Sequence, residues 1–429
     1  MSASLEKGIH ALKEVIDAPI ASYFASCVHC GLCAEACLFY TETGDPKYTP
    51  IHKLEPLRRV YEQEYTLLGR VKKLLGVSKP VTDDELAEWQ ELVYNSCTLC
   101  ARCSAVCPVG NDIVYMVRKL REGMAVSGHA PHGIDEAVTR TVTTGSPMGI
   151  KLPAVQAQMK HVEANTGLAV PMDVEGAEYM VIMSSMEIIN FPEYLESVAR
   201  ILHQAGKTWT LCSTAFEATN GGIQLGNSDL AGLIVQRIVD GAERLKVKTV
   251  ISPECGHAYT ALRWEGPNLI GRPFTFAVKH IVEVLDEFRA QGLIKTEGFE
   301  TDKLTFHDPC QLARRGGVIR QQRNLLGSVA KNFVEMPDAG FMNWCCGGGG
   351  GVTAIEEAEA LRLEAFKRKK QQIEAVQPDR LVTACAVCRS TLEEGLEHYN
   401  MAIPVVGLTE MIASHLVETR PVANKEPQA

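Results

Sequence analysis

The sequence lacks the features of a nucleic-acid-binding, membrane-spanning or secreted protein. Its 43 Lys and Arg against 52 Asp and Glu give a formal net charge of −9, without the basic excess that phosphate binding requires. Apolar runs such as residues 231–235 end after a few positions, too soon to cross a bilayer. The N-terminus has neither the basic nor the apolar segment of a secretory signal. We therefore expect a cytoplasmic chain with no membrane span of its own and no nucleic-acid partner.

Low-complexity segments are also missing, and 46% hydrophobic with 22% charged residues is a globular composition. A chain of 429 residues is long enough for two or three domains. We expect a helical domain over residues 1–150, one α/β unit over 151–300 and another over 301–417. The polar segment 418–429 is expected to be a disordered tail.

Cysteine, in contrast, is abundant, and eight of the 15 cysteines form two runs with the spacing C-x2-C-x2-C-x3-C. The runs are Cys27, Cys30, Cys33 and Cys37, then Cys97, Cys100, Cys103 and Cys107. This spacing indicates metal ligands in a reducing compartment rather than disulfides, and it matches zinc poorly. In two-cluster ferredoxins the fourth cysteine of each run binds the other cluster. One predicted [4Fe-4S] cubane therefore takes Cys27, Cys30, Cys33 and Cys107, and the other takes Cys97, Cys100, Cys103 and Cys37.

The segment between the two runs, residues 38–96, is mostly helical in pattern, which is typical of helical ferredoxins rather than compact bacterial ones. Leu5, Ile9, Leu12 and Ile16 predict a further short amphipathic helix, which packs on its own domain or docks on a partner. The segment 145–149 has the composition of a linker.

A second cysteine set consists of Cys310, the adjacent pair Cys345-Cys346 followed by Gly347, then Cys385 and Cys388. Five thiolates are one more than a cubane needs, so we expect this third cluster, cubane or noncubane, to carry out chemistry. The glycines of 347–351 allow close backbone approach to an inorganic core and are expected to leave it uncovered on one side. A nucleotide loop is disfavoured, because no Lys-Ser or Lys-Thr follows these glycines.

Other candidate residues lie near these cysteines in the sequence. His307 precedes Cys310 and could relay protons or simply end a strand. Arg314 and Arg315 could hold a carboxylate or remain solvated. Cys255, within Glu254-Cys255-Gly256-His257, is expected at the mouth of the third cluster, with Glu254 and His257 as proton donors; the alternative is an inert buried thiol. Cys212 is interpreted as a core residue.

From about residue 178, short apolar segments alternate with helical ones, which predicts α/β layers. Candidate strands are 179–183, 208–211, 249–252, 304–307, 333–335, 380–383 and 404–406, and candidate helices are 191–205, 228–245, 274–290, 354–376 and 389–399. The two halves of this region align, with Glu254 on Cys385, His257 on Cys388 and Ser185 on Cys310. The predicted fold is a multidomain α+β chain: a helical two-cluster ferredoxin domain, then a duplicated α/β pair with pseudo-twofold symmetry.

The order of Cys310, Cys345-Cys346-Gly347, Cys385 and Cys388 resembles the cysteine-rich CCG domain of heterodisulfide reductases, where five cysteines hold a catalytic iron–sulfur centre. Four segments, 44–47, 149–151, 209–211 and 254–258, extend this resemblance to one subfamily. It is that of DsrK, the K subunit of the dissimilatory sulfite reductase-associated DsrMKJOP membrane complex, and its relative TmcB. The corresponding subunit of methanogen heterodisulfide reductase usually keeps two full CCG sets, whereas this chain has one.

The resemblance implies a catalytic subunit on the inner face of the cytoplasmic membrane, held there by a cytochrome b-type partner. It implies thiol:disulfide oxidoreductase activity, with electrons exchanged between a quinone-linked partner and a disulfide or dithiol substrate. That substrate would be a DsrC-like sulfur-carrier protein or a low-molecular-weight disulfide. The alternative function is an electron-transfer subunit of a flavin-dependent 2-hydroxyacid (glycolate or lactate) dehydrogenase. The sequence leaves the direction of electron flow open, because cluster potentials depend strongly on environment.

Overall fold

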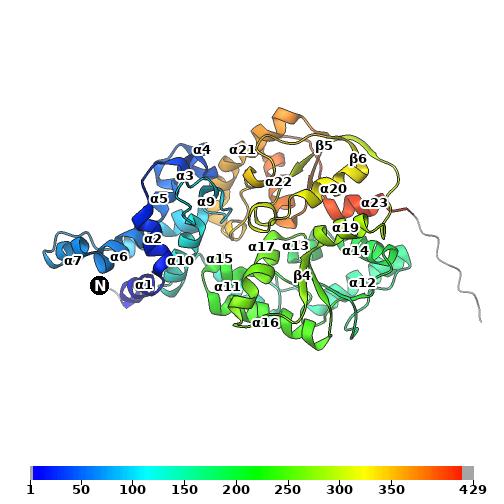
Figure 1. Ribbon diagram of the computed structural model, residues 1–429, viewed down its shortest axis with the longest axis horizontal. Helices are drawn as coiled ribbons and strands as arrows, with labels where there is room; N and C mark the ends of the chain where they lie inside the picture. Colours follow the sequence, from blue (N-terminus) through cyan, green and yellow to red (C-terminus); the bar gives the residue numbers. More distant parts are fainter. Residues whose placement is uncertain (1–2, 418–429) are drawn as a thin grey trace, which may run out of the picture.

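The computed structural model describes residues 3–417, in which a helical part precedes an α/β part (Figure 1). The helical part, blue to cyan, forms one end of the molecule. The two sheets of the α/β part lie at the other end, with the chain passing from green through yellow to red. This mixed helical and α/β architecture agrees with the predicted fold class. The tail expected over 418–429 lies outside the described residues.

The helical part forms because polar caps begin several of its helices. Thr82 and Glu85 make a capping box at the start of α8, and the Asp17 carboxylate accepts the Ile20 N–H, 3.0 Å away, at the start of α2. Its helices are α1 (Ala3–Glu14), α2 (Ala18–Ser26), α3 (Leu32–Glu35), α4 (Leu38–Thr43), α5 (Pro50–Lys53), α6 (Glu55–Tyr65), α7 (Leu67–Leu74), α8 (Asp83–Gln90), α9 (Arg102–Ala105) and α10 (Ile113–Val126). The next two helices, α11 (His132–Thr144) and α12 (Leu152–Thr166), lie against helices of the α/β part (Figure 1). The predicted N-terminal amphipathic helix is α1, which packs on α10 of its own domain, with Leu5 and Leu12 buried.

The α/β part consists of parallel strands joined through helices. Its strands are β1 (Tyr179–Val181), β2 (Trp209–Thr210), β3 (Thr249–Ser252), β4 (Ala277–His280), β5 (Glu300–His307), β6 (Ala330–Phe333), β7 (Arg380–Thr383) and β8 (Val405–Gly407). Its helices are α13 (Ser185–Ile189), α14 (Glu193–Gln204), α15 (Gly221–Leu225), α16 (Ser228–Arg244), α17 (Gly256–Thr260), α18 (Gly266–Leu269), α19 (Ile281–Ala290), α20 (Arg320–Val329), α21 (Glu359–Val376), α22 (Ala386–His398) and α23 (Leu408–Ser414).

Within residues 3–417 the strands form two four-stranded sheets with the same order. The first sheet runs β2-β1-β3-β4 and the second runs β6-β5-β7-β8. In each sheet the strand that comes first in the chain lies between the second and the third: β1 lies between β2 and β3, and β5 lies between β6 and β7. The carboxyl edge between the two central strands is therefore a topological switch point, where open parallel sheets form their binding crevices. In the second sheet that edge lies at His307, which pairs with Thr383.

One predicted helix is wrong in part. Residues 274–290 were expected to be helical, but β4 occupies Ala277–His280 and α19 begins only at Ile281. Alternate residues Phe276, Val278 and His280 are buried, which is the period of a strand. β4 adds to β3 as a parallel edge strand, a tertiary pairing that the helical spacing of the apolar residues had hidden. His280 then caps α19, its Nδ1 accepting the Val282 N–H at 3.3 Å.

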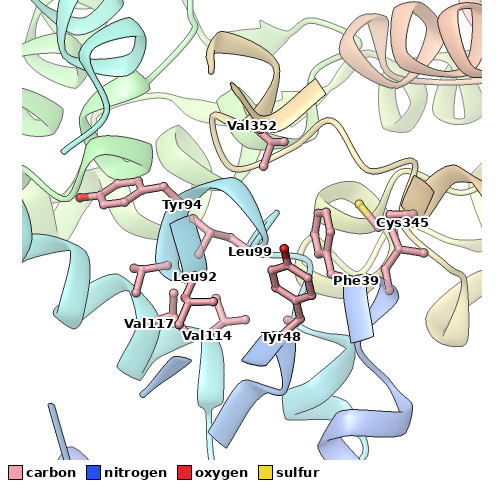
Figure 2. Packing of buried hydrophobic residues seen from close by; sticks show 14 of the residues in the cluster. Phe39, Tyr48, Leu92, Tyr94, Leu99, Val114, Val117, Cys345 and Val352 are labelled. Atoms are coloured by element: carbon pink, nitrogen blue, oxygen red, sulfur yellow. The ribbon is translucent and has the colours of Figure 1, made fainter. Parts of the chain in front are cut away.

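The helical part and the second sheet share one hydrophobic core. Leu57, Leu99 and Val117 belong to the same buried cluster as Trp344 and Val352. Figure 2 shows Cys345 and Val352, both from the C-terminal third of the chain, among side chains of the helical part. The expected linker at 145–149 is anchored as well, since the buried Ser146 hydroxyl lies 2.9 Å from that of Ser185. Within residues 3–417, no helix combines the length and the apolar character that a membrane span would need.

Candidate functional site

The two ferredoxin-type runs share an unusual backbone. His29 and Leu99 stand at the same place in the two runs and have positive φ angles of 53° and 56°. Gly31 and Ala101, each following the second cysteine of its run, have φ angles of 82° and 62°. Positive φ is uncommon outside glycine, so its recurrence points to a loop shape held for function.

The first cavity of the helical part is lined by Cys27, Cys30, Cys33 and Cys107, the crossed set expected for one cubane. Burial, followed by repulsion from the three neighbouring cysteines, raises the pKa of Cys33 to about 11. Four thiols gathered in one cavity are difficult to ionise together unless a cation compensates their charge. The donor set therefore fits a [4Fe-4S] cluster.

The second cavity is lined by the other crossed set, Cys37, Cys97, Cys100 and Cys103. Lys53, which was not singled out from the sequence, also lines it and is only 2% exposed. Its Nζ lies 3.6 Å from the Cys37 sulfur and donates to the Ser96 carbonyl. A buried cation against four thiols suits an anionic cluster.

The CCG cysteines gather at the switch point of the second sheet. Cys310 follows β5, Cys385 and Cys388 follow β7, and Cys345-Cys346 lie in the connection from β6 to α21. All five are buried. The Cys310 and Cys345 sulfurs are 3.7 Å apart, and those of Cys346 and Cys388 are 3.3 Å apart.

His307, at the end of β5, completes this group. One ring nitrogen lies within 4.8 Å of the Cys346 and Cys388 sulfurs, and neither ring nitrogen has a hydrogen-bond partner. Burial, reinforced by Lys369, lowers the pKa of His307 well below its ordinary value. A neutral imidazole with two free nitrogens among thiols has the chemistry of a metal ligand or a proton carrier. The donor set thus fits a cluster, and His307 is also the last residue of β5, as the structural alternative expected.

The CCG site touches the second ferredoxin-type set directly. A hydrogen bond between the Cys100 and Cys345 thiols raises the pKa of Cys100 and lowers that of Cys345. Arg314 fixes this contact: its guanidinium donates to the Cys100 carbonyl at 2.7 Å and to the Asn343 side chain at 2.8 Å. Arg314 is buried, so the expectation of a solvated or carboxylate-binding arginine is wrong. Its N–H groups donate instead to backbone carbonyls of both sites.

The glycine-rich loop is buried under the helical part, contrary to the expectation of an uncovered side. A Cβ on Gly350 would approach the Cys97 carbonyl oxygen to 2.9 Å, and one on Gly349 would meet His257 at 2.9 Å. The Arg121 side chain, fully buried, donates to the carbonyls of Gly350 and Gln224 at 2.7 Å and of Cys97 at 2.8 Å. The glycines therefore permit close contact between chain segments.

Cys255 lies across from the CCG site. It caps α17 with φ −144° and ψ 100°, and Cys385 caps α22 with φ −158° and ψ 115°. Because each cysteine caps the helix that follows it, Cys255 corresponds to Cys385 in the structure. The alignment expected from sequence had placed Glu254, one residue earlier, on Cys385. The two loops meet: the Ala386 N–H donates to the Glu254 carbonyl at 2.7 Å. Burial, then the nearby Cys385 and carboxyl groups, raises the pKa of the Cys255 thiol well above its ordinary value.

Glu254 and His257, the expected proton donors, point in different directions. The Glu254 carboxyl accepts the Thr409 N–H at 2.8 Å and hydroxyl at 2.6 Å, and burial raises its pKa to about 8. The His257 Nε2 accepts the Gly350 N–H at 3.3 Å. Burial, with three nearby arginines, lowers the pKa of His257 to about 4. Glu254 is thus protonated and His257 neutral near pH 7.

One further group near the site, Lys369, was missed from sequence. Lys369 on α21 is buried, and burial lowers its pKa to about 8, with the CCG thiols partly opposing the shift. Arg315, the other arginine expected to hold a carboxylate or remain solvated, lies 3.9 Å from the Glu265 carboxylate and lines a small polar cavity with it and His257. Lys369 lies in a polar stretch of the sequence, which gives no sign that its side chain points inward. Cys212 is buried, hydrogen-bonded to Thr214, and away from the CCG site.

Comparison with protein families agrees with this geometry. A family model described as a 4Fe-4S dicluster domain matches residues 23–111, and the CCG cysteine-rich domain matches residues 304–393. The two matches confirm the predicted [4Fe-4S] cofactors.

Similar proteins extend over most of the chain. An "Hdr-like menaquinol oxidoreductase iron-sulfur subunit 2" from Archaeoglobus fulgidus is 28% identical, covering 92% of this chain and 80% of that protein. A subunit of the dihydromethanophenazine:CoB–CoM heterodisulfide reductase of Methanosarcina barkeri is 27% identical, over 91% and 93%. An "EtfAB:quinone oxidoreductase" from Syntrophomonas wolfei is 26% identical, over 87% and 55%. The chain accordingly carries a 4Fe-4S dicluster domain and a CCG cysteine-rich domain, and over most of its length it is similar to heterodisulfide reductase-like iron–sulfur subunits of oxidoreductases.

Proposed function

We propose that the chain is the catalytic subunit of a membrane-associated complex, exchanging electrons between a quinone-linked cytochrome b-type partner and a disulfide or dithiol substrate. The observation that carries the proposal is the contact between the two cysteine sets, where Cys100 interacts with Cys345 and Arg314 binds both the Cys100 carbonyl and Asn343. It joins a ferredoxin-type set to the CCG set without intervening protein. The names of the relatives, which include a menaquinol oxidoreductase and a heterodisulfide reductase, support both ends of this path.

In this proposal the two crossed cysteine sets each bind one [4Fe-4S] cluster, and the five CCG cysteines bind the third. Such clusters, when bound, supply single-electron transfer at potentials set by their surroundings. The protein supplies the geometry. Arg314 and Arg121 hold the second ferredoxin-type run against the CCG loops through backbone carbonyls. A fixed contact of this kind requires little reorganisation when charge moves.

Substrate sulfur would meet a site with defined proton carriers. His307 is neutral and unpartnered beside Cys346 and Cys388, so it can accept a proton from a thiol or return one to a thiolate. Cys255 approaches from the opposite loop as a second thiol. We assign the substrate to the class of DsrC-like carrier proteins or small disulfides, on the resemblance to DsrK and TmcB.

We further infer that the two sheets are a duplication related by a pseudo-twofold axis, with unit boundaries near residues 150 and 300. The identical strand orders and the matching helix caps at Cys255 and Cys385 support this inference. Within this arrangement Ser184, the cap of α13, takes the position of Cys310, one residue before the Ser185 that the sequence alignment had placed there. The first sheet then keeps the fold but not the ligands.

The alternative is electron transfer to or from a flavin-dependent dehydrogenase without disulfide chemistry. The relative named EtfAB:quinone oxidoreductase favours it. The deciding experiment uses the anaerobically purified, oxidised chain and electron paramagnetic resonance before and after addition of a DsrC-type dithiol. A new signal in wild type and in Cys212→Ser, but not in Cys345→Ser, supports thiol chemistry. No change with the dithiol, together with reduction by a flavoprotein, supports the alternative.

A further inference from the structure

An exposed aliphatic surface lies on α7 and the turn that follows it. We call the α7 surface the set Leu67, Leu68, Val71, Leu74, Leu75 and Val77. Leu67 is 84% exposed and Leu74 is 87% exposed, and the other four are all more than half exposed. Scattered apolar residues are normal on a protein surface, but six within eleven positions form a patch that calls for an explanation.

One cap and one close contact place the helix that carries this surface. The Thr66 hydroxyl caps α7 by accepting the Gly69 N–H at 3.0 Å. A Cβ at Gly69 would lie 1.8 Å from the Glu62 carbonyl oxygen, so only glycine permits this approach of α7 to α6. The buried side of α7 is thus used against α6, and its aliphatic side is fixed outward. Figure 1 shows α7 projecting from the end of the helical part, away from both sheets.

The charge of this segment is opposite to that of the whole chain. Residues 65–82 contain four basic residues and no acidic one, although the net charge of the chain is −9. Lys73 pairs with Glu64 and Lys79 with Glu85, whereas Lys72 makes no ion pair with any residue from 3 to 417. Arg70 donates to the Glu64 carbonyl and is exposed. Basic side chains therefore flank the aliphatic ones.

We propose that the α7 surface inserts into the headgroup region of an anionic lipid membrane. An aliphatic face bordered by Lys and Arg is the pattern of interfacial helices. Protein-binding hot spots are instead rich in Trp, Tyr and Arg and fill pockets, while the α7 surface has no aromatic member and projects from the molecule. The proposal rests on α7 alone and does not require the disulfide chemistry proposed above.

Membrane contact through α7 also sets the order of the cysteine sets. α6, which precedes α7 in the chain, leads from α7 back to the first cavity. Leu54, just before α6, and Arg58 within it line that cavity together with Cys27 and Cys33. The second cavity lies toward the CCG site, because Cys100 touches Cys345. The first set would then face the membrane side, and the CCG site the opposite side.

The test is flotation of the full cluster-containing chain with vesicles of phosphatidylcholine carrying about 30% phosphatidylglycerol, and with phosphatidylcholine alone. The double variant Leu67→Asp/Leu74→Asp changes only exposed side chains, so folding should be retained, as judged by unchanged iron content. Its matched control is Leu233→Asp/Phe299→Asp, where the two side chains are 56% and 48% exposed.

We expect binding of wild type to anionic vesicles, weakened at least about tenfold in Leu67→Asp/Leu74→Asp and unchanged in the control. Lys72→Glu should weaken binding, and binding should fall between about 0.1 M and about 1 M salt. The proposal is overturned if wild type does not float with anionic vesicles, or if the control variant loses binding equally. It is also overturned if α7 instead joins two copies of the chain, seen as a dimer that the Leu67→Asp/Leu74→Asp variant converts to monomer.

Discussion

Replacing Lys53 by Met should lower the reduction potential of the second ferredoxin-type cluster. Lys53 is buried, and its Nζ lies 3.6 Å from the Cys37 sulfur. Adding an electron to the cluster makes it more negative, so a neighbouring ammonium group favours the reduced state. Methionine keeps the length and most of the packing of lysine but removes its charge.

The magnitude follows from Coulomb's law. The added electron spreads over a cluster that begins at the Cys37 sulfur, 3.6 Å from Nζ, and extends to about twice that distance. At an effective dielectric constant of about 20, two unit charges at these separations interact by about 2–5 kcal/mol. For a single electron this corresponds to about 100–200 mV. Relaxation of the surroundings will reduce the value, so a decrease of at least about 50 mV is expected.

The assay is an anaerobic redox titration followed by electron paramagnetic resonance of the reduced clusters. Lys53→Arg, which keeps the charge, should restore the potential, and Lys79→Met, whose side chain is 74% exposed, should leave it unchanged. The first cluster provides an internal reference. The reasoning is refuted if Lys53→Met retains its iron but shifts the second potential by less than about 20 mV, or if Lys53→Arg shifts it as much as methionine does.

Three other outcomes are expected. Cys388→Ser should lower the iron content of anaerobic protein from about twelve to about eight per chain; retention of twelve contradicts the third cluster. Cys255→Ala should abolish thiol-dependent turnover without loss of iron, whereas Cys212→Ala should not; full activity of the first removes its chemical role. In the folded state Glu254 has a pKa of about 8, above its ordinary 4.5. Between these two pH values the folded state holds one proton more than the unfolded state. The free energy of unfolding therefore falls as pH rises through this range, by at most about 1.4 kcal/mol per pH unit. Urea unfolding at pH 5.5 and 7.5 should show this loss in wild type and not in Glu254→Gln; an equal loss in both contradicts it.

Local sequence patterns predicted most of the helices and strands. Strands β3 and β7 were predicted at their observed residues because short apolar runs end in loop-forming residues there. β4 was missed because it is a strand only through its pairing with β3, and the local pattern of apolar residues does not indicate that pairing. The cysteine spacing predicted which thiols gather, since the spacing itself is the geometric constraint on ligands.

The electrostatic surroundings could not be predicted in the same way. Lys53 and Lys369 look like ordinary helix-surface lysines in sequence, and only the packing of distant segments makes them buried. Arg314 illustrates the same limit, because its acceptors belong to Cys100 and Asn343, which are far from it in sequence. Groups that act through long-range contacts leave no periodic signal.

Buried carboxyl groups gather at the switch point of the first sheet, where the Glu254 loop meets the CCG loop at Ala386. Glu187 accepts the Glu254 N–H at 2.8 Å, and Glu217 accepts the Ser185 N–H at 3.0 Å. Burial raises the pKa of Glu187, Glu217 and Glu254 and so favours the protonated form of each carboxyl group. Ionised carboxylates there would repel the thiolates of the CCG site across the facing loops, whereas protonated ones add no negative charge. Burial therefore outweighs the hydrogen bonds from N–H and O–H donors, which favour the ionised carboxylate, and shifts these groups toward the neutral form that suits a thiolate-rich neighbour.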